Sequence, residues 1–362
     1  MEGVTFRWLG AGETAVLLPL LRASFGTWPG VTTPVSASEH LEWKTSFQEG
    51  GGTAHAVGEV DGEVVACQLA VYQPYLFHGS RVTIFRGWDS AVHPRLHGQG
   101  IMRDLRAFVR ERSHVECDAH IGAFTRSPAM LRLHEYEGRI AVGAKLETLI
   151  APLTLGSAID ALKLRSWRSF PKAVRSAGAL ARWAIGRRSP AAPVQGCTVR
   201  DAGRFDERVT PLFEEASGAF DAVLERTPAF LNWRYADRRG GEFAIKLAEE
   251  SERLVGYTVL RVTGGHAYIA DLLVMPGRDD VLRALAGAAL AHFRGSGLDA
   301  LECMIPAWHP YVPILQDCGF VGRRVRKTPF SFLPLRMTPA ELSFLQDPDL
   351  RLHLLLGDSD TI

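Results

Sequence analysis

Hydrophobic and polar positions follow the same order of patterns in two long stretches of the chain. In the first stretch, helical spacing gives way to extended runs, and the dipeptide Asp61-Gly62 separates two of these runs. This dipeptide is typical of a type I′ hairpin turn, in which both central residues have positive φ. The predicted elements are helices at 15–25 and 37–47, strands at 53–60, 63–72 and 81–92, a helix at 101–112, a strand at 118–125, a helix at 128–136 and a strand at 140–150. This order predicts an α/β unit built on a mixed central sheet.

The second stretch begins near Cys197 and repeats this outline. Its predicted elements are strands at 243–249, 254–262 and 266–275, a helix at 281–293, a strand at 298–305, a helix at 311–318 and a strand at 320–332. The block 226–235 fits an earlier helix, with Thr227 as its cap and Pro228 in its first turn. The Trp and Arg side chains of this block could contact a ligand or serve helix packing. The shared order predicts a duplicated fold.

The segment between the two stretches has a different composition. Eight basic residues lie between Lys163 and Arg188, and Asp160 is the only acidic residue in 151–195. A basic amphipathic helix can bind an anionic surface, or it can simply connect two domains. We therefore expect an N-terminal domain at 1–152, a basic helical connector at 153–195 and a C-terminal domain at 196–362.

Overall composition excludes several classes of protein. The 41 Lys and Arg residues nearly balance the 40 Asp and Glu residues, so we expect no general nucleic-acid partner. The five cysteines are scattered, which fits neither a disulfide framework nor a metal site. No apolar run approaches about 18 residues, and the first residues do not resemble a secretory signal. These features predict a cytoplasmic protein without a membrane span or a metal.

A glycine-containing loop carries the clearest chemical signal. The predicted strand at 81–92 is followed by Pro94 and by the spacing Arg95-x-x-Gly98-x-Gly100, and a predicted helix begins directly afterwards. Two glycines allow a tight turn whose backbone can approach a ligand closely. The N–H groups of such a loop converge with the free N–H groups of the helix start, and this arrangement favours phosphate.

This segment resembles the pyrophosphate-binding motif of the GNAT superfamily of N-acetyltransferases, written Gln/Arg-x-x-Gly-x-Gly/Ala. The resemblance covers residues 1–150 in element order and, more faintly, 197–335. It implies a mixed sheet whose fourth strand splays from the fifth, with acyl-coenzyme A, most simply acetyl-CoA, bound in the gap as co-substrate. By position, the strand residues that would contact the pantetheine arm are Ser90, Ala91 and Val92. The residues that would hold the pyrophosphate, largely through main-chain groups, are Arg95, Leu96, His97, Gly98, Gln99, Gly100 and Ile101.

The same resemblance suggests where the proton transfers occur. The family commonly places a Tyr four residues before the glycine that ends the helix after strand five, and here this position is His134. His134 could protonate the leaving thiolate, whereas Tyr136 lies about 200° further around the helix. Candidate bases for the amine are Asp89, late in the fourth strand, and Glu42, on the second helix. The tryptophans that could line the acceptor pocket are Trp28, Trp43 and Trp88.

The second stretch departs from the motif. Its loop contains one glycine, Gly277, followed by Asp279 and Asp280, and two carboxylates at a helix start would repel a pyrophosphate. The position equivalent to His134 is Leu315, which has no proton to donate. We therefore expect a degenerate copy of the GNAT fold that shapes the acceptor site or buttresses the first domain.

Together these features predict a tandem GNAT-fold N-acyltransferase that transfers an acyl group directly to a primary amine of a small molecule. An amino sugar, an amino acid and a secondary metabolite all stay open as acceptors, and the chain could form a homodimer. One alternative is a non-catalytic acyl-CoA sensor or interaction module. Another is a peptidyltransferase-like enzyme that uses aminoacyl-tRNA, with RNA bound by the basic connector.

Overall fold

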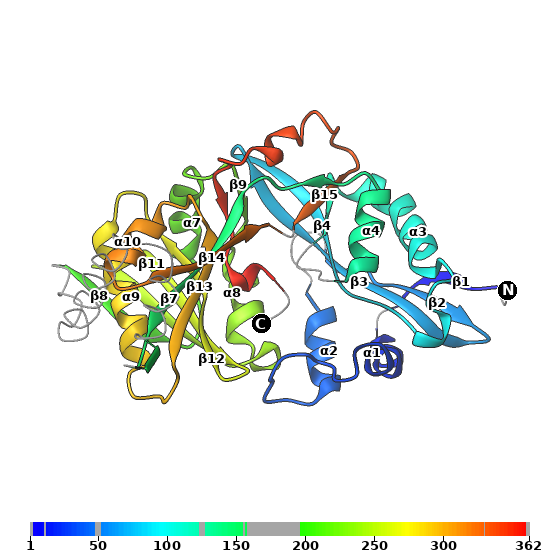
Figure 1. Cartoon of the computed structure of the whole chain (residues 1–362), viewed down its shortest axis with the longest axis horizontal. Helices are drawn as coiled ribbons and strands as arrows, with labels where there is room; N and C mark the ends of the chain where they lie inside the picture. Colours follow the sequence, from blue (N-terminus) through cyan, green and yellow to red (C-terminus); the bar gives the residue numbers. More distant parts are fainter. Residues whose placement is uncertain are drawn as a thin grey trace, which may run out of the picture.

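The computed structural model describes residues 3–10, 12–47, 52–122, 127–154, 156–157, 196–328 and 330–359. Two twisted mixed sheets stand side by side, and helices pack against them (Figure 1). The N-terminal half supplies most of one sheet and the C-terminal half supplies most of the other. The predicted basic helix at 163–188 lies outside the described residues.

The first half closely follows the predicted order. Its strands are β1 (Thr5–Trp8), β2 (Ala56–Val60), β3 (Glu63–Phe77), β4 (Ser80–Val92), β5 (Ala119–Gly122) and β6 (Ile140–Ala141). Its helices are α1 (Leu18–Phe25), α2 (Ala37–Thr45), α3 (Ile101–Glu116) and α4 (Pro128–Tyr136), with short 3₁₀ turns η1 (Thr14–Leu17) and η3 (Pro94–Leu96). The predicted hairpin turn is confirmed, because Asp61 and Gly62 both have positive φ, at 50° and 81°.

The second half repeats the same layers. Its strands are β8 (Cys197–Ala202), β10 (Phe243–Glu250), β11 (Arg253–Thr263), β12 (His266–Val274), β13 (Ala300–Pro306) and β14 (Val321–Lys327). Its helices are α7 (Val209–Ser217), α8 (Pro228–Leu231), α9 (Asp279–His292) and α10 (Tyr311–Asp317). The Thr227 hydroxyl accepts a hydrogen bond from Phe230 N–H at 3.0 Å, as predicted for the cap. The helical block predicted at 226–235 is present as α8 followed by η4 (Asn232–Ala236), which has the wider π-helical turn.

The two sheets exchange strands. β7 (Lys145–Pro152) lies between β13 and β14 in the second sheet, whereas β15 (Ser331–Pro334) lies between β5 and β6 in the first. Our predictions of single strands at 140–150 and 320–332 are therefore wrong, because each run is divided between two sheets. The chain passes from the first sheet to the second between β6 and β7, at Gly143, where an added Cβ would collide with the backbone of Gln346. The exchange crosses the boundary that we predicted at residue 152.

Further contacts join the two halves. β9 (Ala222–Leu224) pairs with the end of β3, and β16 (Leu352–His353) pairs with β9, so two more strands of the second half extend the first sheet. The largest hydrophobic cluster draws side chains from both halves, including Leu21 and Leu231. Separating the halves would expose this shared apolar surface to water, so we expect them to unfold together.

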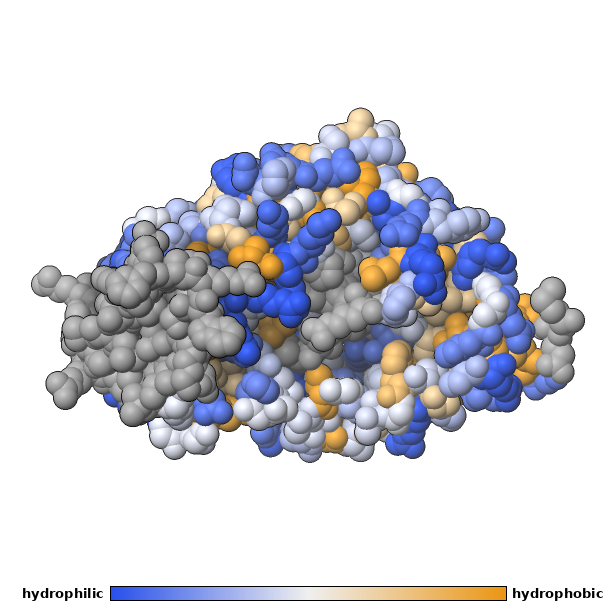
Figure 2. Space-filling view, viewed as in Figure 1, coloured by the Kyte–Doolittle hydropathy of each residue, from blue (hydrophilic) through white to orange (hydrophobic). Residues whose placement is uncertain are grey.

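The surface is mostly polar where it can be seen. On the face shown in Figure 2, outside the grey residues, hydrophobic side chains occur singly or in small groups among hydrophilic ones. No helix in the described part of the chain is both long and apolar enough to cross a membrane.

Candidate acyl-donor and acceptor site

The first sheet forks next to the glycine loop. β4 and β5 run parallel and pair only from Ile84 to Arg86 of β4, opposite residues 119–121. Beyond Arg86, β4 continues to Val92 with β3 as its neighbour, so the edge that faces away from β3 is open. Its backbone N–H and C=O groups can therefore pair with an extended ligand in the gap.

A β-bulge accompanies the fork. Leu69 of β3 pairs with Trp88 and Cys67 pairs with Ala91, so two β4 residues, Asp89 and Ser90, lie opposite the single residue between them. Asp89 has a φ of 43°, the left-handed conformation that such a bulge can require. The bulge bends β4 where the fork opens. The predicted splay of the fourth strand from the fifth is present.

The predicted phosphate loop has the backbone conformation that the motif requires. Gly98 and Gly100 both have a φ of 81°, in the region that favours glycine. Gly100 caps α3 without a side-chain hydrogen bond, and the first α3 backbone bond runs from Asp104 N–H to Gly100 C=O at 3.1 Å. The N–H groups of the first turn therefore have no intrahelical partner. A 16-residue helix that starts with open N–H groups suits an anionic ligand.

The side chains of this loop face outward or support it. Arg95 forms an exposed ion pair with Glu63 at 2.6 Å, and His97 Nε2 lies 2.9 Å from the Val92 carbonyl oxygen. Leu96 is half-buried, Gln99 is exposed and Ile101 is buried beneath the loop. A Cβ atom added at Gly98 would have no other atom within 4 Å, so the space beside this glycine is open.

A small cavity lies beside the fork, between the two halves. Its volume is about 30 Å³. Its walls come from β4, α2, the segment around α8 and η4, and the C-terminal segment. The lining residues are Val31, His40, Trp43, Lys44, Arg86, Trp88, Phe230, Trp233, Arg234, Gly240 and Ser359. Two of the three predicted pocket tryptophans, Trp43 and Trp88, are therefore brought together here.

Trp43 and Trp233 bind each other across the two halves. Trp43 Nε1–H donates to the Trp233 carbonyl at 2.8 Å, and Trp233 Nε1–H donates to the Trp43 carbonyl at 3.0 Å. The Trp43 and Trp233 rings stack with centroids 4.8 Å apart, and the Trp88 ring is also stacked with Trp233, with centroids 6.1 Å apart. The three indoles form a wall that is fixed by hydrogen bonds as well as by packing. Trp28 is buried behind His40, in edge contact with it, and does not line the cavity.

The two predicted bases have different surroundings. The Asp89 carboxylate forms an ion pair with Lys44 Nζ at 2.7 Å, and both side chains are largely buried. Asp89 therefore lies at the fork, next to a residue that lines the cavity. Glu42 is exposed on α2, whereas its neighbours Trp43 and Lys44 point into the cavity.

His40 is a candidate that the sequence did not single out. Its Nδ1 lies 2.8 Å from the Arg239 carbonyl oxygen, so Nδ1 carries the proton and Nε2 carries the lone pair. Burial lowers the pKa of His40 to about 4, so the ring is neutral at pH 7. The sequence pattern could not single out His40, because its place in the site depends on a contact with Arg239, a residue 199 positions away.

His134 is buried under the end of β5. Its ring packs against Gly122, and its Nδ1 lies 3.5 Å from the Ser331 hydroxyl of the exchanged strand β15. Burial, together with the positive charges of Arg139 and Arg106, lowers the pKa of His134 to about 4. At pH 7 the ring is neutral and can donate an N–H hydrogen bond. Tyr136 is 77% exposed.

The second half has a fork of its own, which a side chain fills. β12 pairs in parallel with β13 only from Ala267 to Ile269. Further along β12, the Tyr311 hydroxyl accepts from Val274 N–H at 2.9 Å and donates to the Val274 carbonyl at 3.1 Å. Arg278, in the loop before α9, is paired with Glu250 and Asp280. Both backbone groups of Val274 and the Arg278 side chain are thus already paired with protein groups.

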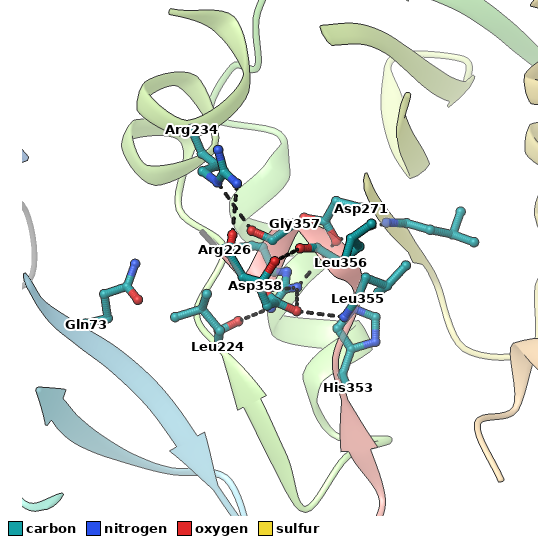
Figure 3. Close-up of polar contacts among 12 residues, drawn as sticks. Gln73, Leu224, Arg226, Arg234, Asp271, His353, Leu355, Leu356, Gly357 and Asp358 are labelled. Carbon is teal, nitrogen blue, oxygen red and sulfur yellow. Dashed lines mark hydrogen bonds and ion pairs between the residues drawn. The ribbon is translucent and has the colours of Figure 1, made fainter. Parts of the chain in front are cut away.

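A buried ionic network holds the segment around Asp358 in place (Figure 3). Arg226 donates to both Asp358 carboxylate oxygens at 2.8 and 3.0 Å and to Asp271 Oδ1 at 3.3 Å. Arg234 donates to the backbone carbonyl of Ser359 at 2.9 Å. Ser359, a lining residue, is therefore fixed by contacts that burial makes hard to break.

Within the described residues, no group of three or more His, Cys, Asp or Glu side chains is arranged to hold a metal ion. All five cysteines are free, and burial raises the pKa of Cys67, which donates to the Asp89 carbonyl, and of Cys303.

Comparison with known proteins supports the fold. Neither the protein-family models nor the curated proteins contain a match to this chain. Among solved structures, the chain is similar to a conserved protein of unknown function from Enterococcus faecalis V583, which is described as a probable N-acyltransferase. The two are 13% identical with a TM-score of 0.65, and the match covers 92% of this chain and 73% of that one. A GCN5-related N-acetyltransferase from Anabaena variabilis is 11% identical with a TM-score of 0.61, covering 91% and 72%.

A tandem GNAT protein from the clavulanic acid biosynthesis pathway is also similar. It is 16% identical with a TM-score of 0.55, and the match covers 93% of this chain and 100% of that one. The match therefore extends over both halves.

Proposed function

The chain has a tandem GNAT fold, and we propose that it is an acyl-CoA-dependent N-acyltransferase whose donor binds to the N-terminal half. The observation that carries this proposal is the fork between β4 and β5 next to the loop with Gly98 and Gly100. An open strand edge and a helix start with free N–H groups are the two features that a pantetheine arm and a pyrophosphate require. Both lie on one side of the first sheet.

The reaction would be direct attack of a neutral amine on the thioester carbonyl. The N–C bond forms and the C–S bond breaks, the amine loses a proton, and the leaving thiolate takes a proton from water. In this proposal Asp89 takes the amine proton, directly or through water, because it lies at the bulge where the fork opens. His134 stabilises the thiolate by an N–H hydrogen bond, since its neutral ring has no extra proton to give at pH 7.

The acceptor would enter from the cavity side of β4. Trp43, Trp88 and Trp233 supply a flat apolar wall there. His40 offers a second acceptor of the amine proton through Nε2, and Glu42 would act only at the exposed rim. The acceptor is a small amine in this proposal, because the wall lies in a narrow space between the halves.

The second half would serve as a buttress without a donor of its own. Tyr311 already pairs with the strand edge of β12, and the carboxylates of Asp279 and Asp280 lie at the start of α9. The second half instead contributes Trp233, Arg234 and Ser359 to the cavity wall.

A thiol-release assay tests this proposal. The whole chain is incubated with acetyl-CoA and a panel of primary amines, and free coenzyme A is measured with a thiol reagent, with a sample lacking amine as the control for hydrolysis. We expect release that depends on the amine and a product that carries one acetyl group on nitrogen. Binding of acetyl-CoA without release for any amine would instead favour the acyl-CoA sensor.

A further inference from the structure

We propose that the cavity between the halves binds an anionic group of the acceptor, most simply a carboxylate. The acceptor would then be an amine that also carries a carboxylate, as an amino acid does. This inference rests on the proposed acyltransferase function and adds the chemical class of the amine.

The charged side chains that line the cavity share one sign. Lys44, Arg86 and Arg234 are cationic, and none of the described lining residues carries a carboxylate. His40 is neutral at pH 7 because burial lowers its pKa. The Lys44 charge is balanced by Asp89 behind it, at 2.7 Å. The cavity wall is therefore electropositive.

Arg86 is the residue on which the inference depends. Its side chain is 5% exposed. The hydrogen-bond partner that the described residues give it is the Gln73 amide oxygen, at 3.1 Å, which has no charge. Arg226, by contrast, is fully buried but faces the carboxylates of Asp271 and Asp358. A buried guanidinium is costly unless an anion compensates it, so a ligand carboxylate would supply what the protein does not.

Trp88 provides a second donor on the same face. It lies two residues after Arg86 on β4, and both side chains line the cavity. Its Nε1–H is buried and has no hydrogen-bond partner in the described part of the chain. Most buried indole N–H groups are paired, so this donor marks a place for an acceptor atom. A carboxylate has two oxygens and can accept from both residues.

The size and place of the cavity fit one small anionic group. Its volume of about 30 Å³ has room for a group the size of a carboxylate, and the rest of the acceptor would lie outside it. Arg86 is also the last β4 residue that pairs with β5, so the cavity begins where the fork opens. A carboxylate bound there would keep the adjoining amine next to the fork, where the thioester is proposed to lie.

The binding test uses the three stacked indoles as a fluorescent probe. The whole chain is titrated with phenylacetate and with its neutral isostere phenylacetamide. We expect phenylacetate to bind about 10- to 100-fold more tightly, as charged hydrogen bonds give. Arg86→Gln should abolish this difference, whereas Arg283→Gln, an exposed arginine of α9 paired with Asp317, should preserve it.

Equal affinity for the two probes, no binding of phenylacetate, or an unchanged preference in Arg86→Gln would overturn the inference. If Arg86→Gln does not fold, Trp88→Phe decides the matter. It should weaken phenylacetate by about 2- to 10-fold and leave phenylacetamide unchanged, and equal effects on both probes would contradict the proposal. Acetyl-CoA binding is measured on the same samples. If the native chain does not bind acetyl-CoA, the proposed acyltransferase function is refuted. If it binds acetyl-CoA but does not prefer phenylacetate, only the proposed class of acceptor is refuted.

Discussion

Removing Arg226 should destabilise the whole chain by about 3–5 kcal/mol at pH 7, the usual loss when one partner of a buried ion pair is removed. The side chain of Arg226 is fully buried between Asp271 and Asp358, and it also donates to the Leu224 carbonyl at 2.7 Å. Arg226→Met keeps much of the side-chain volume, so the expected loss reflects charge more than a cavity.

The pH dependence of this loss is a second part of the prediction. Burial already raises the pKa of Asp271, and the loss of Arg226 removes the positive charge that lowers it. In Arg226→Met, the pKa of Asp271 in the folded chain should therefore lie above its value in the unfolded chain. At low pH the neutral, protonated Asp271 is tolerated in the folded chain, and the variant loses stability as pH rises through this pKa. The difference between Arg226→Met and the native chain should therefore shrink as pH falls from 7 towards 5.

Urea unfolding followed by circular dichroism measures both effects. Arg351→Met is the matched control, because Arg351 is half-exposed and pairs with Asp221 at the surface. We expect this control to lose less than about 1 kcal/mol. The reasoning is refuted if the two variants lose similar stability, or if the loss in Arg226→Met is the same at pH 5 and pH 7.

Three further predictions concern acid stability, the strand exchange and catalysis. Burial lowers the pKa of His55 to about 4 and that of His309 to about 3. The free energy of unfolding should therefore be highest above pH 6.5 and should fall as pH drops towards 4, by about 3 kcal/mol for His55 alone. Urea unfolding at a series of pH values measures this decrease. Gly143→Ala should cost about 1–3 kcal/mol in the same assay, because its Cβ meets the backbone of the opposing loop at the crossing between sheets, and a neutral result would contradict that geometry. Asp89→Asn should lower kcat by about 100-fold or more, while the affinity for acetyl-CoA changes by less than about twofold. His134→Ala should lower kcat by a smaller factor. Unchanged kcat in both variants would show that neither residue takes part in the reaction.

Local patterns predicted most of the elements, including the glycine loop between β4 and α3. The hairpin at Asp61-Gly62, the Thr227 cap and the helix after Gly100 all depend on residues close in sequence, and each is present. The tight turn predicted at Gly98 and Gly100 is also present, and both glycines have left-handed φ.

The strand exchange and the cavity could not be predicted in this way. An apolar run such as 145–152 specifies a buried strand but not the sheet in which it pairs, because each sheet offers a strand, β5 or β13, with which such a run can pair antiparallel. The contact of Trp43 with Trp233 joins residues 190 positions apart. The unmatched charge at Arg86 is visible only once burial and partners are known.

Calorimetric titration of acetyl-CoA into the native chain, Gly98→Glu and Gly277→Glu tests whether the acyl donor binds to the loop before α3. Gly98 and Gly277 occupy corresponding loops of the two halves, both have positive φ, at 81° and 74°, and neither has a neighbour within 4 Å of an added Cβ. The two substitutions therefore impose a similar backbone strain and differ in the fork beside them. We predict one site per chain in the native protein and in Gly277→Glu, and no binding in Gly98→Glu. Binding that survives in Gly98→Glu, or that is lost in Gly277→Glu alone, would contradict a donor site on the N-terminal loop.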